Sequence, residues 1–153
     1  MYFIIFLPMK RMLFATLLWI TACTVTRMAP TPILPEWMKG SFRDDYGIRY
    51  TITDTTISMD GAARYHILSW NEREQYVLTR NDSSNKTDGG LFTRLDYMRF
   101  TGMEPYTWGY CFTVYDAPDA VTALQKAAAD RENPKKGCNG YPFSRMKMIK
   151  EKR

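Results

Sequence analysis

The stretch 106-YTWGYCFTVY-115 alternates large apolar side chains with small or polar ones along its whole length. A period of two residues is typical of a β-strand, in which successive side chains point to opposite faces. One face of the predicted strand carries a row of mostly aromatic side chains: Tyr106, Trp108, Tyr110, Phe112 and Val114. The other face carries Thr107, Gly109, Cys111 and Thr113. The aromatic face predicts a core built around this strand.

The same period recurs in shorter segments on both sides of this strand. Further strands are expected at Ile48–Thr53, Ile57–Met59, Tyr65–Ser69, Gln75–Thr79, Leu91–Thr101 and Tyr141–Met148. Asp60-Gly61 is a strong signal for a hairpin turn, and 81-NDSSNKTDGG-90 is typical of a long polar loop. Short strands at this spacing predict a mainly β fold. We expect a small antiparallel β-barrel or a strongly curled sheet of seven or eight strands, with one α-helix packed outside.

The helix is expected directly after the aromatic strand. Asp116 is placed to cap it, and Asp119 would lie in its first turn, near the positive end of the helix dipole. Asn133-Pro134 is expected to end it, because proline breaks a helix. The narrow apolar side of this helix would consist of Val121, Leu124 and Ala128.

The N-terminal stretch 10-KRMLFATLLWITAC-23 places two cations before a short apolar run that ends in small residues. The uncharged run extends only from Met12 to Val25, whereas a helical bilayer span needs about 20 apolar residues. This order is typical of a secretory signal peptide, which we place at 1–22. A start at Met9 gives the expected order of basic, apolar and small residues. The alternative is a start at Met1, with residues 1–8 as a second apolar piece.

The end of this run resembles the lipobox of bacterial lipoproteins, in the residues Ile20-Thr21-Ala22-Cys23. The resemblance implies that the Cys23 thiol is acylated and that the chain is cut before it. It also implies a lipid anchor in the outer membrane, facing the periplasm, because Thr24 rather than an aspartate follows the cysteine. Several acyl chains would hold the protein on a membrane essentially permanently. The alternative is ordinary cleavage with an unmodified Cys23.

The chain contains three cysteines. If Cys23 carries lipid, as the resemblance implies, Cys111 and Cys138 are left to form a disulfide in an oxidising periplasm. The disulfide would stabilise the fold by about 3–4 kcal/mol in the chain-entropy model. It would tie the segment after the helix to the Cys111 face, so the aromatic row would point into the barrel. Two free buried thiols are the alternative, and a metal site is disfavoured because close ligand spacing is lacking.

The aromatic row has two interpretations. It either fills the core, as side chains do in many small barrels, or borders a cavity for an apolar or aromatic ligand. The ligand-binding candidates are Tyr50, Tyr97, Trp108 and Tyr110. On the neighbouring predicted strand, the side chains expected to face inward are Leu91, Leu95 and Tyr97, and those expected under the helix are Phe92, Met98 and Phe100.

Two segments of the domain resemble known families. The stretch 36-EWMKGSFRDDYGIRYTI-52 resembles the opening of lipocalin-like barrels, in which a tryptophan near a glycine starts the first strand and closes the barrel floor; here these are Trp37 and Gly40. The stretch 60-DGAARY-65 resembles the Ser-Gly-x-x-Tyr loop of membrane-bound inhibitors of c-type lysozyme. That resemblance implies a loop that enters the cleft of a glycosidase.

These observations divide the chain into four parts. They are a signal peptide at 1–22, a lipidated cysteine with a proline-rich tether at 23–36, a lipocalin-like β domain at 37–146 and a basic tail at 147–153. Removal of residues 1–22 takes away Lys10 and Arg11, so the formal net charge would fall from +5 to about +3, which is too mild to indicate a nucleic-acid partner. The basic tail is either simply solvated or contacts a phospholipid surface.

Motifs that would name an enzymatic activity are missing from the sequence: it contains no nucleophile elbow, dinucleotide fingerprint, P-loop or zinc-protease helix. The only histidine, His66, is expected to be exposed or satisfied. Asp44 and Asp45 are adjacent, so a strand would place them on opposite faces rather than across one bond. We therefore expect no metal ion and no cofactor.

The leading hypothesis is a lipid-anchored periplasmic or envelope binding domain without catalytic activity, which carries a small apolar ligand or contacts an envelope protein. An inhibitor of c-type lysozyme and an unrecognised envelope enzyme are the alternatives.

The lipid anchor leads to a first prediction. Mass spectrometry of the mature protein from bacterial membranes should find an N-terminal Cys23 that carries acyl chains, because the lipobox directs both modification and cleavage. An intact chain that starts at Met1 or Met9 would contradict the anchor.

Overall fold

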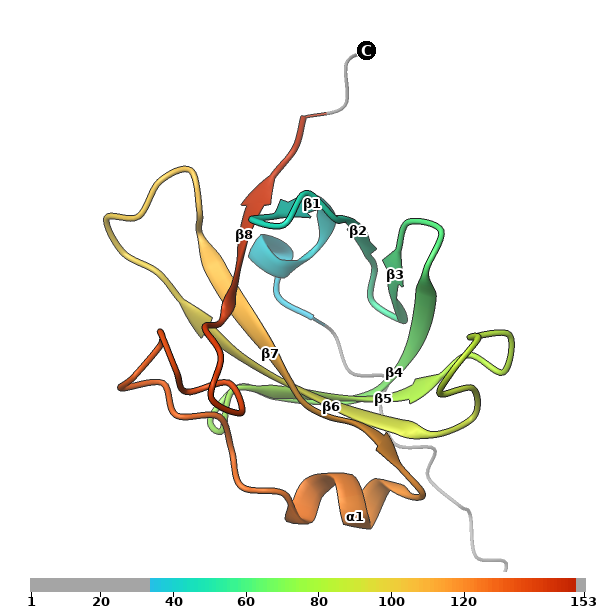
Figure 1. Ribbon diagram of the computed structural model, residues 1–153. Coiled ribbons are helices and arrows are strands. Elements are labelled where there is room, and N and C mark those ends of the chain that lie inside the picture. Colours follow the sequence, from blue (N-terminus) through green and yellow to red (C-terminus); the bar gives the residue numbers. More distant parts are fainter. Residues whose placement is uncertain (1–33, 151–153) are drawn as a thin grey trace, which may run out of the picture.

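Eight antiparallel strands close into a barrel in the computed structural model, which describes residues 34–150 (Figure 1). Each strand pairs with the next along the chain, and β8 pairs with β1 to close the ring. The strands are β1 Gly40–Asp44, β2 Arg49–Ile52, β3 Thr56–Met59, β4 Ala63–Asn71, β5 Tyr76–Asn81, β6 Phe92–Arg99, β7 Trp108–Ala117 and β8 Ser144–Met148. A short 3₁₀ helix, η1 (Glu36–Met38), precedes β1, and the helix α1 (Ala120–Gln125) follows β7. The predicted fold class is confirmed.

Several parts of the sequence-based description lie outside the described residues. They are the signal peptide 1–22, Cys23, the tether up to residue 33 and the last residues 151–153. Within residues 34–150, no helix has the length and apolarity needed to cross a bilayer. The barrel reaches beyond the domain boundaries drawn from the sequence. Leu34, in the predicted tether, is buried in the core, and Met148, in the predicted tail, pairs with Phe42.

The short helix η1 lies beside the start of β1 and adds buried side chains to the core inside the barrel (Figure 1). Met38 is buried, and the indole of Trp37 meets the rings of Tyr97 and Trp108 edge-on, at centroid distances of 5.8 and 6.1 Å. The guanidinium of Arg99 lies 4.9 Å from the Trp37 ring centroid. Edge-to-face rings and a cation over an indole each add to simple burial. Trp37 therefore anchors the chain entry to the barrel.

Strand β7 follows the predicted alternation over its first half only. Trp108 and Tyr110 point into the barrel core, and Phe112 packs partly against the same core. Val114 was expected on this face, but it packs on the outer side, beneath α1. The pairing explains the switch. Leu95 of β6 lies opposite Phe112, and the residue before Leu95 lies opposite Val114, so β7 contains one extra residue, Thr113. Such a β-bulge reverses the alternation beyond it.

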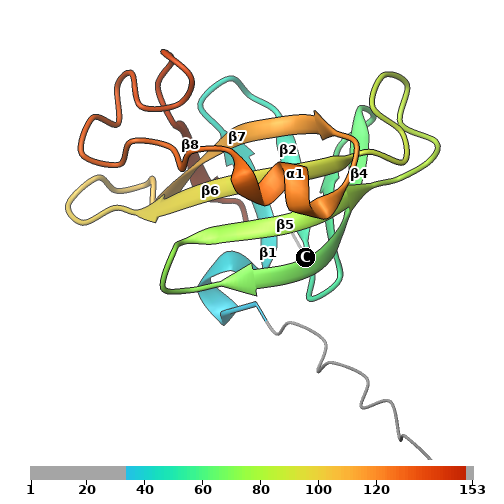
Figure 2. The same ribbon diagram turned by 90° about the horizontal axis from the view of Figure 1, so that it is seen from below.

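Helix α1 packs outside the sheet, against β5, β6 and β7, as Figure 2 shows. Its position outside the sheet agrees with the prediction, but its start does not. Asp119, not Asp116, caps it, because the Asp119 Oδ1 accepts a hydrogen bond from the Thr122 backbone nitrogen at 2.7 Å. Asp116 belongs to β7, which continues to Ala117 before the chain turns.

The later start also changes which side of α1 is buried. Ala123 is fully buried, whereas Val121 and Leu124 of the predicted apolar side are exposed. The helix ends at Gln125, because the backbone of Lys126 is already extended, so it stops before Ala128 and well before Asn133-Pro134. The predicted apolar side and stop signal were therefore wrong. A helix this short gains its stability from tertiary contacts rather than from its own propensity.

A buried carboxylate holds the segment after α1 against the outside of β6. Asp96 of β6 has 0% exposure, and its oxygens accept hydrogen bonds from Arg94 and Arg131, each with an Nη2–Oδ1 distance of 3.0 Å. The Ala129 backbone nitrogen, at 3.3 Å, and the Thr113 hydroxyl also donate to this carboxylate. Each donor comes from a different position along the chain. The full set satisfies a charge that would otherwise be costly to bury.

The two arginines extend this network to the backbone. The Arg94 Nη1 donates to the carbonyl oxygens of Leu124 and Lys126, at 3.2 and 3.3 Å, where the end of α1 leaves carbonyls without intrahelical partners. Arg131 donates through Nε to the Tyr97 carbonyl at 2.9 Å. Its Nη2 also reaches two carbonyls at the β4–β5 turn. Arg94, Asp96 and Arg131 thus fix the long connection from β7 to β8 on the barrel wall.

The network predicts a strong stability effect for Asp96→Asn. The substitution should lower the free energy of unfolding by about 3–5 kcal/mol, because it leaves buried arginine charge without its counter-ion. Asp116→Asn is the control, since Asp116 is exposed and should change stability by less than about 0.5 kcal/mol. Chemical denaturation of both variants measures the difference. Equal, small effects would contradict the role given to Asp96.

Candidate functional site

The four ligand-binding residues predicted from the sequence lie together inside the barrel. Tyr50, Tyr97, Trp108 and Tyr110 are each at most 6% exposed and belong to one core cluster. The rings of Tyr50 and Tyr110 are 5.6 Å apart, and those of Trp108 and Tyr110 are 6.2 Å apart. None of the four lines the pockets described below. Their contacts favour the interpretation of the aromatic row as core.

Hydrogen bonds inside the barrel pair most of the polar atoms of these rings. The Tyr50 hydroxyl bonds to the Tyr110 hydroxyl and donates to the Asp44 Oδ2 at 3.2 Å. The Trp70 Nε1 donates to the Tyr97 hydroxyl at 2.7 Å. Among the described side chains, the buried Trp108 Nε1 has no hydrogen-bond partner. The tyrosine hydroxyls are therefore already engaged in holding the core.

Burial also changes the acidity of the internal tyrosines. Desolvation is the largest cause and raises the pKa of Tyr110 to about 12 and that of Tyr65 to about 12. It raises the pKa of Tyr50 as well, with a further contribution from the neighbouring Tyr110. A buried phenol resists ionisation because the phenolate loses its hydration. Burial therefore favours the neutral, protonated form of these tyrosines in the core.

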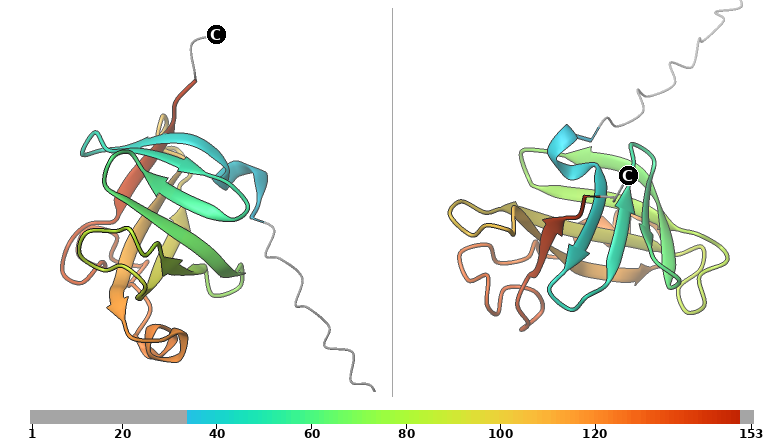
Figure 3. Two further views of the ribbon diagram at one scale, coloured as in Figure 1. Left: turned by 90° about the vertical axis from the view of Figure 1, so that its right-hand side faces the viewer. Right: turned by 90° about the horizontal axis from the view of Figure 1, so that it is seen from above.

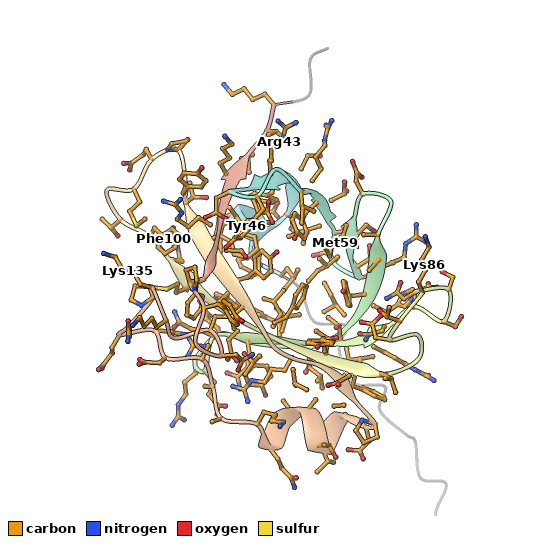
Figure 4. All side chains as sticks on the ribbon, in the orientation of Figure 1. Arg43, Tyr46, Met59, Lys86, Phe100 and Lys135 are labelled. Carbon is orange, nitrogen blue, oxygen red and sulfur yellow. A yellow bond between two sulfur atoms is a disulfide. The ribbon has the colours of Figure 1, made fainter. Side chains whose placement is uncertain are left out.

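A cavity of about 610 Å³ lies on the outside of the barrel, where the β6–β7 loop, the segment before β8 and the β1–β2 turn meet. Figure 4 labels three of its lining residues, Tyr46, Phe100 and Lys135. We call this cavity the outer groove. Its lining residues are Asp45, Tyr46, Met98, Phe100, Met103, Pro134, Lys135, Pro142, Phe143 and Arg145.

The floor of the outer groove rests on the predicted disulfide. Cys111 and Cys138 are bonded, with their Cα atoms 5.5 Å apart, as the cysteine count predicts. Phe143 is 2% exposed and packs with both cysteines and with Met98. The bond joins β7 to the segment that forms one wall of the groove. It therefore serves the groove as well as the stability of the fold.

Charged side chains lie at the rim of the outer groove. The Arg145 Nε lies 2.8 Å from the Asp45 Oδ2, and the Arg145 guanidinium stacks over the Tyr106 ring, 4.7 Å from its centroid. Lys135 forms no hydrogen bond or ion pair with another residue of the described part of the chain. The groove thus combines an apolar floor with one paired cation and one free cation.

A second, smaller pocket of about 430 Å³ lies between the β3–β4 hairpin and the loop after β5; Figure 4 labels two of its residues, Met59 and Lys86. The hairpin contains the segment that resembles lysozyme inhibitors. Gly61 lies in the turn, as predicted, but Tyr65 is buried in the barrel and its ring lies 5.3 Å from that of Phe112. Tyr65 is thus a core residue rather than a residue of the hairpin tip.

The remaining candidates from the sequence have structural partners. His66 is half exposed, and its Nε2 lies 2.8 Å from the Asp82 Oδ2. Asp44 is buried and Asp45 faces Arg145 on the outside, so the two adjacent carboxylates lie on opposite faces, as expected. Over residues 34–150, no group of three or more histidine, cysteine or acidic side chains is placed to hold a metal ion.

Comparisons with protein-family models, curated proteins and solved structures found no match to this chain. The class of the protein is therefore stated from its own structure. It is a closed, eight-stranded, antiparallel β-barrel with one short external helix and an apolar groove on its outer wall.

The outer groove was not predicted from the sequence. Leu95 and Tyr97 face inward and Phe92 packs near α1, as expected, but Met98 and Phe100 line the groove instead of lying under the helix. The helix is too short to cover them. The sequence contained one signal for the groove. Met98 and Phe100 are apolar and were expected on the outside of the sheet, next to the Cys111 face, so they needed a cover other than the helix.

The raised tyrosine pKa values predict alkaline destabilisation. Below pH 10 both the folded and the unfolded protein hold the phenolic proton, so the contribution to stability is complete. Between pH 10 and 12 only the folded state holds it, and stability is lost as the pH rises. For Tyr65, with a folded pKa of about 12, the loss at pH 11 is about 1–1.5 kcal/mol.

Denaturation at pH 8 and pH 11 measures this loss. Tyr65→Phe should reduce the difference between the two values, because phenylalanine has no proton to lose. Tyr141→Phe, at a 73% exposed position, should leave it unchanged. Identical pH dependence in all three proteins would show that Tyr65 titrates normally.

Proposed function

We propose that this protein is a non-catalytic binding domain of the bacterial cell envelope, and that its outer groove binds a small amphiphile with an apolar body and an anionic end. The observation that carries the proposal is the groove itself, with the buried Phe143 and the half-buried Met98 and Phe100 on its floor and an unpaired lysine at its rim. The barrel interior is engaged in its own packing, which favours a site on the wall.

The size and lining of the outer groove support a small ligand. Pockets for small molecules typically measure about 300–1,000 Å³ and are lined mainly by apolar side chains with a few polar groups. The groove has about 610 Å³ and presents Phe100, Met103 and Phe143. Methionine adapts its shape to irregular apolar partners, so a flexible chain fits this lining better than a rigid polar ring system.

The charge at the rim supports an anionic end on the ligand. The charge of Arg145 is already compensated by Asp45, whereas Lys135 has no carboxylate partner within residues 34–150. A carboxylate or phosphate beside the exposed Lys135 would complete an ion pair at the rim. A ligand with a cationic end would meet Lys135 with like charge and is disfavoured.

The three cysteines support a location in the cell envelope in two ways. The predicted acylation of Cys23 would place the barrel on a membrane, and the bond between Cys111 and Cys138 is typical of oxidising compartments such as the periplasm. Inhibition of c-type lysozyme is a weaker proposal, because Tyr65 of the matching segment is buried. Binding of an amphiphile therefore remains the preferred activity.

A fluorescent fatty acid provides the test. The protein should bind it with measurable affinity. Lys135→Gln should weaken binding about three- to fivefold through loss of the ion pair, and Met103→Asp about tenfold or more, by placing a charge in the apolar lining.

Matched controls separate the groove from general effects. Lys136→Gln changes the same charge at the neighbouring residue, which does not line the groove, and Leu68→Asp alters an apolar side chain of similar exposure, 43% against 40% for Met103. Both controls should bind like the unchanged protein. No binding, or equal losses in the controls, would contradict the outer groove as the site.

A further inference from the structure

Three cations from three adjacent strands lie side by side on the outer face of the barrel. Arg43 of β1 is directly opposite Arg49 of β2 on one side and Lys147 of β8 on the other. Their neighbours Phe42 and Asp44 are buried, so period two places Arg43 and its two partners on the outside. We call these three residues the cationic stripe. It lies across the barrel from α1, as the left view of Figure 3 shows for β1 and β2.

The stripe is poorly compensated within the protein. The side chain of Arg43 forms no hydrogen bond, ion pair or ring contact with another residue of the 34–150 range. Within the described residues, the Lys147 ammonium contacts only the Tyr106 ring, 5.7 Å from its centroid. Arg49 has a loose ion pair with Asp60, at 3.7 Å between half-exposed side chains. Such exposed pairs contribute little.

This arrangement costs stability. Like charges directly opposite each other on neighbouring strands are destabilising. Strands are about 4.8 Å apart, so the stripe spans about 10 Å, within one Debye length at about 0.1 M salt. The three charges therefore add to one local field. The charge of the Arg43 side chain has no partner within residues 34–150, which points to a role outside the fold.

We infer that the cationic stripe docks the barrel on an anionic phospholipid surface. An array of basic side chains with several positive charges within one Debye length matches a layer of anionic headgroups.

The predicted anchor is compatible with this orientation. The chain from Cys23 to Leu34 is long enough to span about 36 Å when extended. A lipid on Cys23 would therefore hold the barrel near the membrane without deciding which face touches it. The cationic stripe would determine that the face carrying Arg43 contacts the membrane. The inference is independent of the outer groove, because no residue of the stripe lines it.

The test uses the unacylated full chain, Cys23→Ser, with vesicles of phosphatidylcholine alone or mixed with phosphatidylglycerol. The ratio of the two partition coefficients is the readout, since the N-terminal segment is common to all variants. The ratio should be well above one and should fall as salt is added. The triple variant R43Q, R49Q, K147Q should lower it by about a hundredfold, at about fivefold for each cation.

A charge-matched control removes three cations from other parts of the surface: Arg73→Gln, Arg80→Gln and Lys86→Gln. Lys86 lies well away from Arg43 in Figure 4. This control should keep most of the preference for anionic vesicles. An equal loss in both triple variants would overturn the inference in favour of net charge alone. Equal competition by inorganic phosphate at millimolar concentration would overturn it in favour of a simple anion site.

Thermal unfolding gives an independent readout. The stripe variant should melt no lower than the unchanged protein, because the opposed like charges are relieved. A lower melting temperature would show that the stripe is structural and would overturn the inference. Lys135→Gln should keep vesicle binding while it weakens binding of the fatty acid, so a failure of the groove proposal is distinguishable from a failure of this one.

Discussion

The buried carboxylate of Asp96 is the interaction on which the outer architecture depends. A barrel of consecutive hairpins needs little beyond its ladders and its core, but the long connection between β7 and β8 has only one short helix of its own. Arg94 and Arg131 meet at Asp96 and reach backbone carbonyls on both sides. An ionic network of this kind is weak support for overall stability but specifies one arrangement. Here it specifies where the wall of the outer groove begins.

Because side chains fill the interior of the barrel, a binding site is expected on its surface. An eight-stranded barrel is just wide enough for side chains to fill it. Here Trp108, Tyr110 and Tyr50 do so, and the hydroxyls of the two tyrosines bond to each other. A ligand inside would have to displace rings and break those bonds. A ligand on the wall would only cover side chains such as Met103, which are already partly exposed. The energetic difference favours the wall.

The sequence predicted what depends on local period and failed where distant residues decide. Alternation placed Tyr50 and Trp108 correctly, and the cysteine count found the disulfide, because each is a property of a short stretch or of composition. The bulge at Thr113 could not be read, since it depends on how β6 and β7 pair, and it redirected Val114. The outer groove needs three segments far apart in the chain, and the charge of Asp96 is paired with Arg94 nearby and with the distant Arg131.

Strand β8 connects the two proposed surfaces. Its inward Met146 is part of the core, whereas its outward Arg145 lies at the rim of the groove and its outward Lys147 belongs to the stripe. Both cations also face the ring of Tyr106. A barrel that rests on anionic headgroups through the stripe would therefore hold the groove close to the bilayer surface. An amphiphile that leaves the membrane would meet Lys135 and the apolar floor after a short path, which gives a physical reason for one strand to carry both features.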